Sequence, residues 1–177
     1  MNDRYIHPII LNNPIRSLVN PRGKVVSRFS QFVQQGGRIM DLGSGPGYFV
    51  PALSKLKGDG VLLITDPDIR ALERMKGRDE DLLVFQSSAS FLPLRDGSLD
   101  FVFSNLVLCC LLDHEGAVRE LRRVLRKGGK AYLSVTRFKG RDPRGLSREE
   151  WERVLSNFKG LRRGESLNER WAVVQVE

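Results

Sequence analysis

The sequence predicts an α/β sandwich built on a mostly parallel sheet of seven strands. Short apolar runs alternate along the chain with amphipathic stretches of helical period, which is the order that successive βα units produce. The run VLLIT at 61–65 is almost continuously apolar, as expected for a parallel strand that is buried on both faces. After residue 136 the order changes to one helix followed by two strands, which predicts an antiparallel hairpin at the sheet edge.

The first helices are predicted from their start and stop signals. One helix should begin at Asn20-Pro21 and end at Gly36-Gly37, because proline is favoured in the first turn and glycine after the last. A second should cover 49–56 and stop near Gly58. A third should start at Asp66-Pro67 and run to about Met75.

The later helices carry stronger signals. Asp113 is placed to cap a helix that ends at Gly128-Gly129, and Ser147 with Glu150 forms a capping box for a last helix that runs to about Phe158. Strands are expected at 38–42, 61–65, 82–85, 101–104, 131–135, 161–163 and 171–176.

The length of 177 residues and the hydrophobic content of 41% indicate one domain, 1–177. Its expected parts are a lead-in and helix at 1–37, a ligand-binding core at 38–136, and a helix and hairpin at 137–177. The longest apolar stretch, Leu106–Leu112, is too short to cross a bilayer, and the N-terminus lacks the layout of a signal peptide. We therefore expect a cytoplasmic protein without a membrane segment.

The net charge of +8 is unevenly distributed along the chain. Residues 1–40 and 118–136 each hold six basic side chains and one acidic side chain, whereas 41–117 hold seven basic and twelve acidic side chains. Basic flanks can face an anionic partner, or they can form an ordinary solvated surface. The sequence leaves both interpretations open.

The strongest chemical signal is the segment DLGSGPG at 41–47, between a predicted strand and a predicted helix. Glycines let the backbone turn sharply and let a ligand approach with no Cβ in the way. A dinucleotide-binding loop has the pattern G-x-G-x-x-G, but this loop is G-x-G-x-G and follows an acid, Asp41, that would repel a pyrophosphate. Asp41 instead suits a cationic group such as an α-amino group. An ordinary tight turn is the alternative.

Asp66 ends the second predicted strand, 19 residues after Gly47. In doubly wound sheets an acid at this place accepts hydrogen bonds from the hydroxyls of a ribose. The alternative is a purely structural role as the N-cap of the next helix, with Pro67 in the first helical position.

The order of these motifs resembles the class I S-adenosylmethionine-dependent methyltransferases, in the branch with the type 11 methyltransferase domain. The resemblance spans about 38–136 and implies a Rossmann-like three-layer fold, with seven strands of which the last is antiparallel, and S-adenosyl-L-methionine as the cofactor. The segments that carry it are RIMDLGSGPGYF at 38–49, ITD at 64–66, LPLRDGSLDFVFSN at 92–105 and LRRVLRKGG at 121–129.

The resemblance also implies which residues contact the cofactor. The family usually has an acid at the adenine edge, where this chain has Ser88, and no metal is implied. The implied residues are Asp41, Gly43, Ser44, Gly45 and Gly47 at the methionine portion, Asp66 at the ribose, Pro67, Ser88 and Ala89 at the adenine, and Asn105 and Leu106 beneath the sulfonium.

No catalytic residue is assigned from the sequence. Methyl transfer needs a base only when the acceptor atom is protonated, and the candidates are few. Tyr5 and His7 belong to the lead-in, and His114 follows the cap Asp113 and is expected to face solvent. Cys109 and Cys110 stand where many relatives have two histidines, and at least one of them is expected to be a small buried residue.

Three functions are compatible with these observations. The leading hypothesis is methyl transfer to a small-molecule acceptor, by an in-line displacement that requires mainly alignment and exclusion of water. The second makes RNA or a protein the acceptor and rests on the basic flanks and the basic run at 137–144. The third is a cofactor-binding module without catalysis that serves a partner protein. A homodimer could complete the site, because 177 residues leave little room for an acceptor-binding insert.

Overall fold

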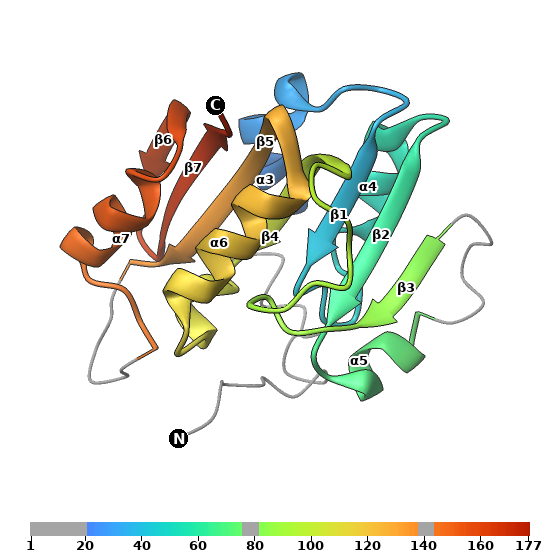
Figure 1. Ribbon diagram of the computed structural model, residues 1–177, viewed down its shortest axis with the longest axis horizontal. Coiled ribbons are helices and arrows are strands. Elements are labelled where there is room, and N and C mark those ends of the chain that lie inside the picture. The colour runs from blue at the N-terminus through green and yellow to red at the C-terminus, as the bar shows by residue number, and fades with distance from the viewer. Residues whose placement is uncertain (1–20, 76–81, 138–143) are drawn as a thin grey trace.

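The computed structural model describes residues 21–75, 82–137 and 144–177. The described residues form one sheet of seven strands in the order β3-β2-β1-β4-β5-β7-β6 (Figure 1). Its parallel part comprises β1 (Arg38–Leu42), β2 (Val61–Asp66), β3 (Leu82–Gln86), β4 (Leu99–Asn105) and β5 (Leu125–Thr136).

The hairpin of β6 (Lys159–Glu165) and β7 (Glu169–Gln175) completes the sheet. β7 pairs antiparallel with both β5 and β6, so the hairpin extends the sheet at one edge. This arrangement confirms the predicted fold class, including the antiparallel C-terminal strands.

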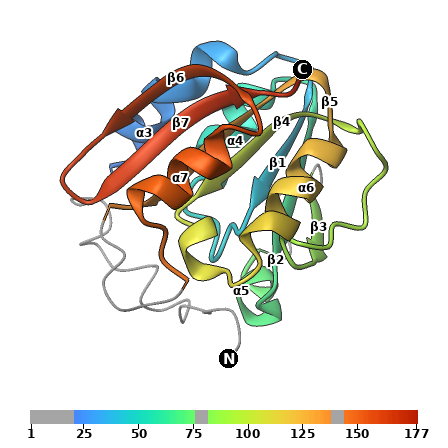
Figure 2. The same ribbon diagram turned by 60° about the vertical axis from the view of Figure 1, so that its left-hand side comes forward.

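Helices cover both faces of the sheet and form a sandwich of three layers (Figures 1 and 2). Because side chains alternate along a strand, Ile39 and Phe101 face one core and Met40 and Val102 face the other. The first core packs against α3 (Arg22–Phe29), α4 (Val50–Lys57) and α5 (Ile69–Glu73), and the second packs against α6 (His114–Val124) and α7 (Arg148–Leu155).

Two predicted helix caps are confirmed. The Asp113 carboxylate accepts a hydrogen bond from the Gly116 amide at 2.8 Å at the start of α6. At α7 the Ser147 hydroxyl accepts from the Glu150 amide at 3.2 Å, and the Glu150 carboxylate accepts from the Ser147 amide at 2.6 Å. Both caps depend on residues within one turn, which is why the sequence could predict them.

Several predicted boundaries are wrong. α6 does not extend to Gly128-Gly129, because Leu125 is already extended at φ −73° and ψ 133° and begins β5. Gly128, at φ +75°, instead lies within β5, in the segment 126–129 where the register between β4 and β5 shifts. The first helix ends earlier than expected, at Phe29, and continues as a 3₁₀ turn, Ser30–Phe32. The last helix also ends earlier, at Leu155.

A buried ionic cluster joins α3 to the C-terminal strands. The Arg28 guanidinium donates to the Glu169 carboxylate at 2.6 Å and to the Tyr132 hydroxyl at 2.8 Å, and that hydroxyl donates to Glu169 at 3.2 Å. Arg28 also lies over the ring of Trp171, 4.9 Å from its centre. Burial and the neighbouring Glu169 charge raise the pKa of Tyr132. The cluster therefore connects segments that are more than 100 residues apart in the sequence.

Replacing Arg28 tests this cluster. Arg28→Met leaves the Glu169 carboxylate buried without its cation, so we expect the free energy of unfolding to fall by about 3–5 kcal/mol in urea titrations. Lys24→Met, on the exposed side of the same helix, is the control and should change it by less than about 0.5 kcal/mol. Equal effects of the two substitutions would contradict a stabilising role for the cluster.

A second ionic group holds the loop between β3 and β4 against α6. The Glu120 carboxylate accepts from the Leu92 amide at 2.7 Å and from Arg123, whose guanidinium donates to the carbonyl oxygens of Leu92 and Leu94 at 2.9 and 2.7 Å. Hydrogen bonding from Arg123 lowers the pKa of Glu120. A carboxyl group with a lowered folded-state pKa stabilises the fold above its ordinary pKa, and this contribution is lost as the pH falls.

The lowered pKa of Glu120 predicts how the effect of Glu120→Gln on stability depends on pH. The variant should unfold more easily than the wild type at pH 7, and the difference should shrink as the pH falls below the ordinary glutamate value of 4.5. Urea titrations across this range provide the measurement. A difference that is the same at every pH would show that the Glu120 charge contributes nothing to stability.

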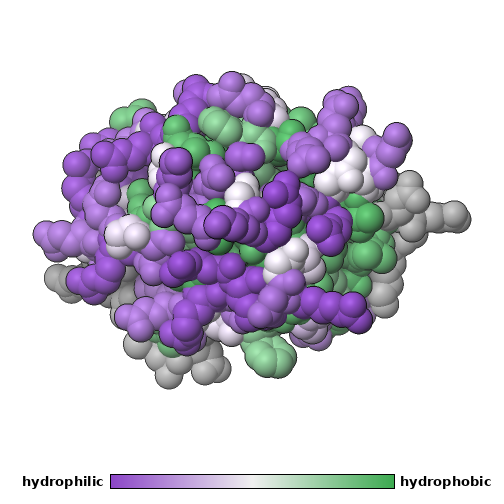
Figure 3. Space-filling view, turned by 45° about the horizontal axis from the view of Figure 1, so that its top comes forward, coloured by the Kyte–Doolittle hydropathy of each residue, from purple (hydrophilic) through white to green (hydrophobic). Residues whose placement is uncertain are grey.

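Hydrophilic side chains cover most of the face shown in Figure 3, with smaller apolar areas between them. In the part of the chain that the structure describes, no helix is long and apolar enough to cross a membrane.

Candidate functional site

Buried polar side chains gather at the carboxyl ends of the parallel strands, the edge toward which the arrowheads of β1, β2 and β3 point in Figure 1. Asp41 is 2% exposed near the end of β1, and Thr65, Asn105 and Ser134 are buried near the ends of β2, β4 and β5. Burying polar groups costs free energy unless they find partners. Open α/β sheets bind ligands at this edge. The carboxyl edge is therefore the candidate site.

The glycine loop lies at this edge and requires its glycines. Gly43, Gly45 and Gly47 have φ values of +71°, +56° and +80°, a region that other residues rarely adopt. A Cβ on Gly43 would collide with the side chain of Val107, and one on Gly47 would collide with Met75. The loop therefore lets the segments after β1 and β4 approach each other closely.

Two amides fix this loop to β2. The amides of Gly43 and Ser44 both donate to the Thr65 carbonyl, at 2.8 and 3.1 Å. The Ser44 side chain is only 6% exposed, and its hydroxyl has no hydrogen-bond partner among the described residues. A buried hydroxyl without a partner is the kind of group that a polar ligand would satisfy.

Asp66 is not the N-cap of α5, so that assignment is wrong. Asp68 caps that helix, its carboxylate accepting from the Arg70 amide at 3.1 Å, and α5 starts at Ile69 instead of Pro67. The Asp66 carboxylate accepts from the Gly45 amide at 2.8 Å and from the Asp68 amide at 2.9 Å. Burial raises the pKa of Asp66, although these two hydrogen bonds act in the opposite direction. Asp66 thus faces the glycine loop.

The end of β4 carries backbone strain. Leu106 has φ +61°, and it is the one non-glycine residue with a positive φ in the described part of the chain. Its amide donates to the Ser134 carbonyl at 3.2 Å and lies 3.0 Å from the Ser134 hydroxyl, which in turn donates to the Asn105 side-chain oxygen at 3.3 Å. Strained residues of this kind persist where surrounding contacts hold them, often at functional sites.

The residues predicted at the adenine lie at the ends of β2 and β3. The Pro67 carbonyl accepts from the Gln86 side chain at 2.8 Å, which brings the two strand ends together. Ser88 follows β3, its hydroxyl 3.1 Å from that of Ser90, and Ala89 is buried. The structure therefore places every predicted cofactor residue at one edge, beyond four neighbouring strands. Their contacts with a cofactor remain predictions.

The cysteine pair, which replaces the histidines of many relatives, and the candidate proton acceptor His114 both lie among the described residues. Cys109 is buried, as expected, and Cys110 is half-buried; their thiols donate to the Leu106 carbonyl at 3.4 and 3.6 Å. Hydrogen bonding with Cys110 is the main cause that lowers the pKa of Cys109 to about 7. His114 is half-buried and its Nε2 lies 3.0 Å from the Arg144 carbonyl, so it does not simply face solvent.

Other predicted features fall on residues that the structure does not describe. Tyr5 and His7 are outside the described ranges, as is 138–143, the middle of the basic run. Within the described ranges, no group of three or more potential metal ligands lies together.

Sequence reasoning missed three contributors to this edge. Thr65 and Ser134 support the site through a backbone carbonyl and a hydroxyl, and Val107 packs against Gly43. The one available signal was a small polar residue near the end of an apolar run, as in VLLIT and AYLSVT. The close approach of Val107 to Gly43 had no signal, because it depends on the pairing of β1 with β4.

Comparison with known proteins identifies relatives of this chain. Residues 40–133 match a family described as "Methyltransferase domain". The biotin biosynthesis bifunctional protein BioHC of Cellvibrio japonicus is 32% identical over 98 residues, which cover 55% of this chain and 19% of that protein. The ubiquinone/menaquinone biosynthesis C-methyltransferase UbiE of Hahella chejuensis is 30% identical over 105 residues, which cover 55% of this chain and 42% of that protein. The chain thus matches less than half the length of these relatives.

The fold recurs among solved structures. A SAM dependent methyltransferase from Aquifex aeolicus superposes with a TM-score of 0.84 at 21% identity, covering 98% of this chain and 100% of that chain. The likeness extends over the helix and hairpin that follow the matched residues 40–133, so the whole layered architecture is shared.

Proposed function

The chain belongs to the methyltransferase domain family, and we propose that it is an S-adenosylmethionine-dependent methyltransferase that acts on a small-molecule acceptor. S-adenosylmethionine is the cofactor that this membership implies. The observation that carries the proposal is the carboxyl edge of the sheet. There the buried Asp41 and the Asp66 carboxylate lie near the ends of two adjacent strands, beside a loop of positive-φ glycines.

The residues at this edge fit the cofactor. Asp41 would attract its α-amino group, and the Ser44 hydroxyl, which has no partner among the described residues, would bond a polar group of the methionine portion. Each Asp66 oxygen accepts one amide, at 2.8 or 2.9 Å, and retains a lone pair for a ribose hydroxyl. The three glycines of the loop carry no Cβ, so a ligand can approach the backbone closely at these positions.

The bound cofactor supplies a methyl group that is already activated by the sulfonium. The chain then has to align the acceptor with it and exclude water. Leu106 would form the floor of this site, and its backbone is held by Ser134. A preorganised floor of this kind contributes to alignment without requiring a base. The proposed function therefore assigns no proton acceptor.

The acceptor class is supported by the relatives. BioHC and UbiE are named for the biosynthesis of biotin and of ubiquinone or menaquinone, which are small molecules. We therefore place a small molecule first, ahead of RNA or a protein, and we expect the protein to work in the cytoplasm. Incubating the full chain with methyl-labelled cofactor and fractionated cell extract separates the three hypotheses. Label in small molecules supports the proposal, label in macromolecules favours RNA or protein, and no label favours a non-catalytic module.

Gly45→Arg should abolish binding of S-adenosylmethionine. Gly45 has φ +56° and its amide bonds Asp66, so an arginine there strains the loop and fills the space for the methionine portion. Calorimetric titration measures the loss, and NAD should bind neither protein. The control is Gly160→Arg on β6, where a Cβ meets nothing within 4 Å. Tight binding of NAD without any response to S-adenosylmethionine would refute the proposal.

Asp66 and Asp68 form a matched pair of substitutions. Asp66→Ala should weaken cofactor binding by about 1.5–3 kcal/mol, the range for hydrogen bonds to a charged group. Asp68→Ala removes the cap of α5, so it should lower the free energy of unfolding by about 1 kcal/mol and leave the affinity nearly unchanged. Calorimetry and thermal melts distinguish the two effects. Unaltered affinity in Asp66→Ala would exclude a ribose-binding role.

A further inference from the structure

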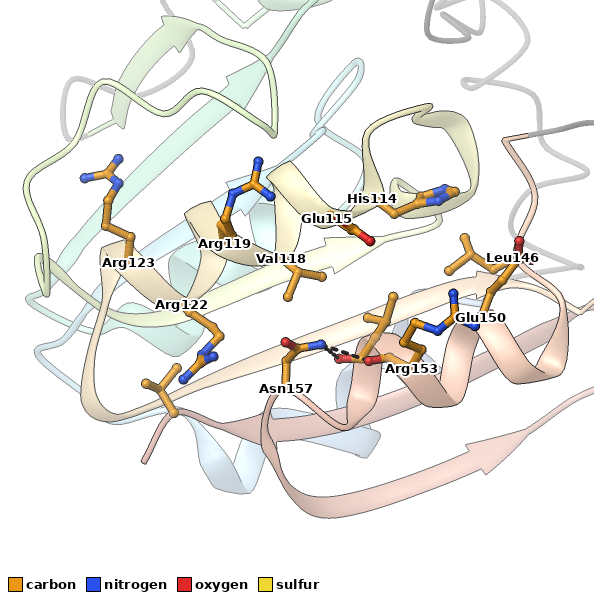
Figure 4. A pocket seen from close by; sticks show the side chains of 12 residues that line it. His114, Glu115, Val118, Arg119, Arg122, Arg123, Leu146, Glu150, Arg153 and Asn157 are labelled. Carbon is orange, nitrogen blue, oxygen red and sulfur yellow. Dashed lines mark hydrogen bonds between the residues drawn. The ribbon is translucent and has the colours of Figure 1, made fainter.

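We propose that the groove between α6 and α7 binds an acidic amphipathic segment of a partner protein. The groove has a volume of about 660 Å³ and lies between the two helices on one face of the sheet (Figure 4). It shares no lining residue with the candidate site, so this proposal does not depend on methyl transfer. The groove is lined by His114, Glu115, Val118, Arg119, Arg122, Arg123, Leu146, Glu150, Arg153, Val154, Asn157 and Val176.

The first observation is that each wall carries exposed arginines that form no ion pair with the described residues. Arg119 and Arg122 lie on α6 and Arg153 lies on α7; all three are exposed. Within the described residues, none of their guanidinium groups makes an ion pair or a hydrogen bond. By contrast, the neighbouring Arg123 is bound to Glu120 at 2.7 Å and to Asp96 at 2.8 Å. Several cations along one concave surface attract anionic groups.

The lining holds four arginines and two glutamates, so its arginines outnumber its carboxylates. Glu150 is engaged in the capping box of α7, where it accepts from the Ser147 amide at 2.6 Å. Glu115 lies beside His114 at one end of the groove, whereas Arg122 and Asn157 lie toward the other end (Figure 4). The end of the groove at Arg122 is therefore expected to bind anions more strongly than the end at Glu115.

The second observation concerns what lies between the charged groups. Val118, Leu146, Val154 and Val176 supply apolar atoms at the base of the groove, and the one aromatic ring among the lining residues is the imidazole of His114. Proteins that grip single-stranded nucleic acid usually stack its bases on aromatic rings. A peptide can contact both the arginines and the apolar base of the groove. Its carboxylates pair with arginines in bidentate geometry, and its aliphatic side chains pack on the apolar base.

The helix lengths indicate the size of the occupant. α6 has 11 residues and α7 has 8, so the walls are about 12–16 Å long at 1.5 Å per residue. This length suits a helix of two to three turns that lies in the groove with its apolar side inward and acidic residues along both borders. The chain's own first 20 residues do not have this composition, because they hold two arginines and one aspartate.

Panning the full chain with displayed random peptides of about 12 residues, roughly three helical turns, tests the proposal. We expect enrichment of peptides that combine aliphatic residues at helical spacing with several Asp or Glu. A fluorescein-labelled copy of such a peptide should bind with a Kd below about 100 µM. The double variant Arg122→Glu/Arg153→Glu should weaken it at least about tenfold.

The control variant is Arg74→Glu/Arg95→Glu, which reverses two exposed arginines outside the groove and should leave the affinity unchanged. Thermal melts establish that both double variants remain folded. Panning that enriches no acidic peptide, or equal weakening in both double variants, would overturn the proposal. So would a single-stranded RNA that binds the wild type, competes with the peptide and is lost in the groove variant, because the groove would then be a nucleic-acid interface.

Discussion

The attachment of the glycine loop to the end of β2 is the interaction on which the candidate site depends. The Thr65 carbonyl accepts two loop amides, and the Asp66 carboxylate accepts a third, from Gly45. These bonds satisfy backbone groups that would otherwise be left unpaired at a tight turn. They also orient the half-buried Asp66 carboxylate toward the loop, so the same few residues hold the turn and form the proposed cofactor site. The strain at Leu106 on the neighbouring strand end belongs to the same region.

The parallel core obtains much of its support from the C-terminal hairpin. β7 pairs with the whole carboxyl half of β5, from Lys130 to Thr136, and its first residue, Glu169, binds Arg28 of α3. The strand that carries Ser134 is therefore held on one side by β4 and on the other by β7. The ionic cluster of Arg28, Tyr132 and Glu169 joins α3 to β5 and β7. It therefore links the packing of α3 to the position of β5, whose Ser134 holds the backbone of Leu106.

The described arginines differ in whether they are paired with a carboxylate. Near the amino ends of β1 and β4, Asp100 pairs with Arg126 at 2.6 Å and with Arg38 at 3.3 Å. In the α6–α7 groove Arg123 is paired with Glu120, whereas Arg119, Arg122 and Arg153 form no ion pair with the described residues. The two proposed binding sites, at the carboxyl edge of the sheet and between α6 and α7, share no residues.

The sequence by itself determined the features that depend on neighbours in the chain. The strand at 38–42, the caps Asp113 and Ser147 and the position of the glycine loop were predicted correctly, because apolar runs, capping side chains and glycines act over a few residues. Only the tertiary structure decided that Asp66 bonds the Gly45 amide, since that hydrogen bond joins residues 21 positions apart. With Asp66 bound there, Asp68 caps α5. The start of β5 at Leu125 likewise depended on its pairing with Leu99 of β4, and the burial of Arg28 depended on a partner 141 residues away.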